Sequence, residues 1–212
     1  MSEYQLTQDV HIIPTPLGAY AAASHPQPDA ARSLILGIMA NETTQKISVE
    51  SLRQYAGNSD PLRLLYWMEK AHWIAGRAEA ETLAAQHIET DVPFLLSQLS
   101  SNGMALLADH QGFHLVNAGF TQEIAEELAI FAAGISALQE KHAGLVRDQL
   151  RLGSMAMGII DSGGNSELGC WPLYIGKHHF MLVISGIPKF DQQAYLHLIW
   201  ALCRRYNSSV SG

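Results

Sequence analysis

The sequence predicts an α+β fold in which a five-stranded antiparallel sheet with helices follows a small, mostly helical domain. Three observations predict it: a strand–turn–strand pattern at residues 104–118, a long amphipathic helix directly after it, and three further strands between residues 154 and 185. In chain order we expect irregular N-terminal strands at 1–29, the helical domain at 30–78, a linker at 79–90, the sheet domain at 91–206 and a tail at 207–212.

Size and composition describe an ordinary folded chain. Its 212 residues can hold one domain or two modest ones, and the fractions of apolar (48%) and charged (16%) residues are typical of folded proteins. No run of about eighteen apolar residues is present, and the first residues lack the basic segment of a signal peptide. We therefore expect a cytoplasmic protein in which Cys170 and Cys203 are buried free thiols.

The N-terminal 29 residues read as two short strands. Val10, Ile12 and Ile13 predict the first, which ends at Pro14-Thr15-Pro16, and residues 18–23 could form the second. The proline-rich segment 25–28 then breaks the chain, and Asp29 can cap a following helix.

Three helices are predicted next. Apolar residues at helical spacing predict a helix over residues 30–40, Ser48 begins a second, and Asp60-Pro61 begins a third. Residues 73–78 follow as an edge strand or wing. This order resembles that of a winged helix-turn-helix.

A DNA-binding role would need basic side chains on the third helix and the wing. The available candidates are Arg63, Lys70 and Arg77, whereas residues 1–90 contain six lysines and arginines against ten aspartates and glutamates. We therefore expect this half to contact protein or to pack on the second half. A DNA-binding transcriptional regulator, dimerising or sensing a signal through the second half, is the alternative.

The second half begins with a helix that Asp91 caps and that carries Pro93 in its first turn, after a linker whose residues 78–90 favour helix. A hairpin follows, with strands at 104–108 and 113–118 and a turn at 109–112 that contains Asp and Gly. Thr121 then caps the longest helix of the chain, residues 122–143.

The long helix carries two stripes about a quarter-turn apart. One contains large side chains: Ile124, Leu128, Phe131, Ile135, Leu138 and His142. The other contains small ones: Ala125, Ala129, Ala132 and Ser136. We expect the large stripe to cover the chain's own sheet and the small stripe, or its flank, to be the dimer interface that meets a second copy; the alternative is that both stripes lie in the core of one chain.

Three more strands are predicted at residues 154–160, 169–175 and 180–185, with polar turns between them. A closing helix follows Asp191, and Arg204 and Arg205 lie in its last turn. The second half therefore has the order α-β-β-α-β-β-β-α.

Residues 91–206 resemble a roadblock / dynein light-chain domain, the profilin-like relative of longin domains. The resemblance rests on residues 103–109 with Gly112, on Ala118-Gly119, and on the acid- and alanine-rich helix 123–137; the turn residues His110-Gln111 and the loop 162–167 depart from the family pattern. It implies a non-enzymatic regulator or scaffold that forms a homodimer and binds or modulates a small Ras-like GTPase.

Sequence motifs for catalysis or cofactor binding are missing. The chain lacks the pattern GxxxxGK[ST] of a phosphate-binding loop, and no serine lies in a nucleophile-elbow sequence. Its ten histidines include His110 and His114 around a turn and the adjacent His178-His179, which do not have the spacing of zinc ligands. We therefore expect no catalytic site, cofactor or metal.

Overall fold

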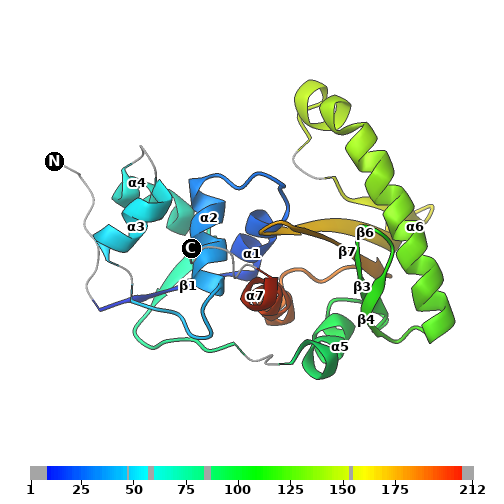
Figure 1. The fold of residues 1–212 in the computed structure, drawn as a ribbon, viewed down its shortest axis with the longest axis horizontal. Helices are drawn as coiled ribbons and strands as arrows, with labels where there is room; N and C mark the ends of the chain where they lie inside the picture. Colours follow the sequence, from blue (N-terminus) through cyan, green and yellow to red (C-terminus); the bar gives the residue numbers. More distant parts are fainter. Residues whose placement is uncertain (1–8, 47, 57–59, 84–86, 153–154, 207–212) are drawn as a thin grey trace.

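The computed structural model of the chain describes residues 9–46, 48–56, 60–83, 87–152 and 155–206. These residues form two halves that pack on each other, with a sheet between helices in the C-terminal half (Figure 1). The predicted tail 207–212, the turn 57–59 and Ser154, the first residue of a predicted strand, lie outside the described residues.

The N-terminal segment contains one strand and one helix. β1 spans His11–Pro14, and α1 spans Pro16–Ala23, so the second strand expected at 18–23 is wrong. Thr15 Oγ1 accepts a hydrogen bond from the Gly18 N–H at 3.0 Å, and Pro16 takes the first helical position. A threonine cap followed by proline is a helix start, and this local signal outweighs the strand-breaking role given to the prolines.

The remaining elements of this half fall where the sequence predicts them. They are α2 (Ala30–Met39), α3 (Val49–Ala56), α4 (Pro61–Lys70) and β2 (Ile74–Arg77). Asp29 caps α2, and Asp60 caps α4. β2 pairs antiparallel with β1, a pairing that the sequence did not indicate. The winged-helix class of this half stays a prediction.

The connection between the halves differs from the sequence prediction. Of the linker residues 78–90 expected to favour helix, 78–83 are not helical, and Thr82 bridges to Thr43 instead, whereas residues 88–90 are helical. α5 spans Ile88–Gln98 and begins before Asp91, which therefore does not occupy the cap position. The Asp91 carboxylate instead accepts a hydrogen bond from the backbone N–H of His87, the residue before the helix, at 2.9 Å.

The C-terminal half has the predicted five-stranded antiparallel sheet. Its strands are β3 (Ala105–Asp109), β4 (His114–Ala118), β5 (Met157–Ile160), β6 (Ser166–Ile175) and β7 (His178–Ser185). They lie in the order β4-β3-β7-β6-β5, so β4 and β5 are the edges. The helices are α5, α6 (Gln122–Lys141) and α7 (Gln193–Tyr206), with a short π-helix, η1 (Gly144–Gln149), after α6. The order α-β-β-α-β-β-β-α is confirmed, with η1 as an addition.

The turn of the β3–β4 hairpin and the start of α6 form as predicted. Asp109 Oδ1 accepts hydrogen bonds from the N–H groups of Gln111 and Phe113, at 2.9 and 2.8 Å. Gly112 follows with φ at 94°, a left-handed value that glycine adopts without strain. The Thr121 hydroxyl caps α6 by accepting from the Ile124 N–H.

The helices form layers around the sheet (Figure 1). α6 covers one face, α5 and α7 cover the other, and α1 and α2 pack on the far side of α7. α7 is therefore buried around most of its circumference, through these residues: Ala194, Tyr195, Leu196, Leu198, Ile199, Trp200, Ala201, Leu202 and Cys203.

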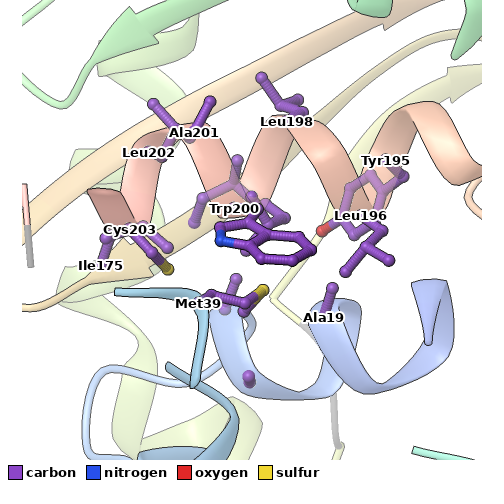
Figure 2. Close-up of a cluster of buried hydrophobic side chains, with 14 of the residues drawn as sticks. Ala19, Met39, Ile175, Tyr195, Leu196, Leu198, Trp200, Ala201, Leu202 and Cys203 are labelled. Carbon is purple, nitrogen blue, oxygen red and sulfur yellow. The ribbon is translucent and has the colours of Figure 1, made fainter. Parts of the chain in front are cut away.

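Trp200 joins the two halves through α7. Figure 2 shows its indole between α7 and the helices of the N-terminal half, near Met39 and Ala19. Its side-chain N–H donates to the Asn41 carbonyl at 2.6 Å. Both halves contribute to one continuous cluster of buried side chains, so they pack as one body.

Candidate functional site

The small face of α6 lies against the chain's own sheet. Ala125, Ala129 and Ala132 are fully buried and Ser136 nearly so, on side chains of β3, β6 and β7. The expectation that these four residues meet a second copy is therefore corrected. Small side chains let the helix axis approach the sheet closely, and the helix meets its own sheet along this face.

The large stripe of α6 is instead on the flank of the helix. Ile124, Phe131 and Leu138 are 47%, 44% and 46% exposed, whereas Leu128 and Ile135 pack partly against the core. At 100° per residue this stripe lies roughly 100° around the helix from the buried alanines. A row of large apolar side chains thus remains accessible along α6.

The edge strand β5 continues this apolar surface. Its pairing sets Met157 opposite Cys170 and Ile159 opposite Leu168, which places both β5 side chains on the α6 side of the sheet. A groove of about 360 Å³ separates α6 from β5, with Phe131 and Ile135 on one wall and Met157 and Ile159 on the other. We call the surface formed by Ile124, Phe131, Ile135, Leu138, Met157 and Ile159 the α6–β5 face.

Cys170 lies at the bottom of this groove and is only 2% exposed. Burial raises the pKa of its thiol to about 11, so the group stays protonated at neutral pH. Cys203 is also buried and free, and burial raises the pKa of that thiol as well. Both cysteines are free thiols, as the sequence predicts, and protonated thiols are poor nucleophiles.

His179, near the start of β7, forms stacked ring contacts with its neighbours. The His179 ring lies 4.5 Å from that of Tyr174 and 5.6 Å from that of His110, measured between centroids. Burial lowers the pKa of His179, and Glu140, with a carboxylate oxygen 3.6 Å from Nδ1, partly opposes that shift. Within the described parts of the chain, no three His, Cys, Asp or Glu residues are grouped so as to hold a metal ion.

The three basic residues considered for DNA contact are all exposed. Arg63 and Lys70 lie seven residues apart on α4, hence on one face, and Arg77 ends β2. The Lys70 ammonium sits 5.6 Å from the centroid of the Tyr66 ring. Trp67 shares that face and is 56% exposed, although its spacing on the helix is that of a core aromatic.

The part of the α6–β5 face that sequence reasoning missed is β5. The run Met157-Gly158-Ile159-Ile160 is apolar throughout, which is the pattern of a strand covered on both faces. In the structure Ile159 and Ile160 are 52% and 65% exposed at the sheet edge. The apolar run is the sequence signal that could have identified this surface, because a fully apolar strand at the edge of a sheet needs a partner to cover it.

No helix in the described ranges is long and apolar enough to cross a membrane. No family model matches the chain. No curated protein matches the chain significantly.

Two solved structures resemble part of the chain. One is the Roadblock/LC7 domain from Streptomyces avermitilis, at 16% identity and a TM-score of 0.35, covering 55% of this chain and 92% of its own. The other is MglB of Myxococcus xanthus, at 16% identity and a TM-score of 0.33, covering 55% of this chain and 90% of its own. The strand order β4-β3-β7-β6-β5 and the helix placement of this chain themselves define its α+β fold.

Proposed function

We propose that this protein is a non-enzymatic regulator or scaffold that forms a homodimer through the α6–β5 face and binds a small Ras-like GTPase. The self-association is supported by one observation above the others. The large side chains of α6 and those of the edge strand β5 form one accessible apolar surface around a shared groove. Contiguous apolar patches on soluble proteins mark sites of protein–protein contact.

The geometry of β5 favours a second copy as the occupant of this face. β5 pairs with β6 on one side only, so its other side offers backbone N–H and C=O groups. Two copies related by a two-fold axis can pair their β5 strands antiparallel, which also brings the two α6 flanks together. The same apolar residues are then buried on both copies.

The GTPase partner is inferred from the resemblance of residues 91–206 to roadblock domains. This resemblance rests on the strand–turn–helix pattern from Gly103 to the alanine-rich helix. The chain itself lacks a phosphate-binding loop motif. A partner GTPase would therefore bring its own nucleotide site, and this protein would read or modulate its nucleotide state.

Substitution of Phe131 by glutamate is expected to convert the dimer into a folded monomer. The change places a charge on the wall of the groove, and it should raise the dissociation constant at least about 30-fold, equivalent to a loss of about 2 kcal/mol at an interface centre. Sedimentation velocity over a range of concentrations measures the constant directly.

Ile130→Glu is the matched control, because Ile130 is the adjacent residue, is 68% exposed and does not line the groove. The control should sediment as the wild-type protein does. If Phe131→Glu left the dimer intact, or if both variants weakened it equally, the α6–β5 face would not be the interface.

The GTPase partner is tested by capture from the lysate of the source cells, with either GDP or a non-hydrolysable GTP analogue present. We expect mass spectrometry to identify a small Ras-like GTPase whose recovery depends on the nucleotide. An eluate that contains only copies of this chain would contradict the partner assignment. Promoter DNA retained at moderate salt would favour the DNA-binding alternative.

A further inference from the structure

A second cavity lies away from the α6–β5 face, at the junction of the two halves. Its volume is about 590 Å³, within the range of roughly 300–1,000 Å³ that small-molecule sites occupy. The N-terminal half contributes residues 24–27 and Arg32, and the C-terminal half contributes the segment from Ala143 to Leu152, which contains η1, and Met155. The cavity therefore exists only when the halves are packed together.

The lining of this cavity is positively charged. Three arginines line it, Arg32, Arg147 and Arg151, against the single acid Asp148. This excess occurs in a chain with a formal net charge of −7. Across the described residues, neither Arg147 nor Arg151 forms an ion pair with a carboxylate.

Arg32 is fixed in place by three contacts. Its Nε donates to the Ala21 carbonyl at 2.9 Å, its guanidinium pairs with Asp29, and its Cζ lies 5.6 Å from the centroid of the Trp73 ring. A guanidinium held in this way loses little side-chain entropy when a ligand binds. Because Asp29 balances the charge of Arg32, the excess positive charge of the lining comes from Arg147 and Arg151, which outnumber the single acid Asp148.

The backbone that carries these two arginines is unusual. Arg147 belongs to the π-helix η1, a rare conformation that occurs frequently at functional sites. Arg151 has φ at 55°, in the left-handed region that non-glycine residues seldom adopt. Strain of this kind persists where the surrounding structure holds a side chain in a required position.

We propose that this cavity binds a phosphorylated small molecule with at least two phosphate groups, held by the guanidinium groups of Arg147 and Arg151. Guanidinium forks match phosphate oxygens in bidentate hydrogen bonds, and each such charge-assisted pair is stronger than a neutral one. The volume accommodates a nucleotide. Since the ligand would touch both halves, its binding would stabilise their packing.

The test is calorimetric titration of ATP, GTP and inorganic pyrophosphate into the whole protein. The double variant Arg147→Gln/Arg151→Gln should bind at least about 100-fold more weakly, as expected for the loss of two charge-assisted contacts. The matched control is Arg53→Gln/Arg63→Gln, which makes the same change in charge at exposed positions on α3 and α4. We expect the control to bind within about twofold of wild type.

Arg151→Gly separates binding from folding. Glycine adopts the left-handed conformation without strain, so this variant should keep or raise the melting temperature while losing affinity. Tighter binding of ATP or GTP than of pyrophosphate would mean that the site recognises a nucleotide, and equal binding would mean that it recognises the phosphate chain alone.

Three outcomes would overturn the proposal. They are no heat of binding for any of the three probes at millimolar concentration, equal weakening in the matched control, and binding of succinate as tight as that of pyrophosphate. None of these outcomes depends on whether the α6–β5 face forms a dimer, because the cavity and that face share no lining residue.

Discussion

Replacing Trp200 with alanine is expected to lower the free energy of unfolding by about 3–5 kcal/mol, the range for removing a large buried aromatic side chain. Trp200 has no exposed surface, and its indole fills the space between α7 and the N-terminal half (Figure 2). The substitution also leaves the Asn41 carbonyl without the hydrogen bond it accepts at 2.6 Å. Urea unfolding followed by circular dichroism measures the change.

The same variant tests whether the halves unfold together. Because one cluster of buried side chains spans both halves, hydrogen exchange in α2 and in β7 should rise at the same urea concentration. Trp67→Ala is the control, since that side chain is 56% exposed and its removal should change stability by only about 0.5 kcal/mol. Protection that persisted in β7 after α2 had lost it would show two independent units.

The second large effect is expected for Ala129→Glu, which should destabilise the fold by at least about 3 kcal/mol. Ala129 is fully buried against the sheet, where β3 and β7 present apolar side chains. A carboxylate placed there has no partner to offset its desolvation. The variant should therefore melt at a much lower temperature or fail to accumulate, rather than form a folded monomer.

Ala137→Glu is the matched control on the same helix, because Ala137 is exposed. It should keep the melting temperature of the wild type within a few degrees. The opposite result, an Ala129→Glu protein that folds normally and is monomeric, would return the dimer interface to the small face of α6.

The two stripes of α6 show how far sequence reasoning reaches. The predicted start of the helix after the Thr121 cap is confirmed, and the helix ends at Lys141, two residues before the predicted end. The angle between the stripes follows from the 3.6-residue period. Which stripe meets the sheet depends on the distance between the helix axis and the sheet, and the periodicity of the sequence does not determine that distance. The larger stripe was assigned to the core because burial favours large apolar residues, whereas close packing on this sheet selected alanine.

The sheet was predictable for a different reason. Its strands are bounded by turns with clear local chemistry, such as Asp109 bonding to the N–H groups of Gln111 and Phe113. At the N-terminus Thr15-Pro16 is an equivalent local signal, because it indicates a helix start, whereas the prediction treats the prolines only as the end of a strand. Local side-chain hydrogen bonding thus explains both the correct prediction of the sheet's turns and the wrong prediction of a strand at residues 18–23.

The arginine-lined cavity was beyond sequence reasoning altogether. Arg32 and Arg147 are far apart along the chain, and neither belongs to a local sequence motif that suggests a binding site. Residues 24–27, which follow α1, come next to η1 in the fold in which α1 packs on α7 and β6. A long-range contact of this type leaves no periodic pattern in the sequence.

The position of α7 in the chain affects synthesis as well as stability. α7 is the last of the described elements, yet α1 and α2 bury their apolar faces on it. Asn41 and Trp200 are 159 positions apart, so at translation rates of about 5–20 residues per second the ribosome needs roughly 8–30 s to deliver the partner of the N-terminal helices. During that interval the apolar faces of α1 and α2 lack α7 as their packing partner, and transiently exposed apolar surface of this kind is prone to aggregation.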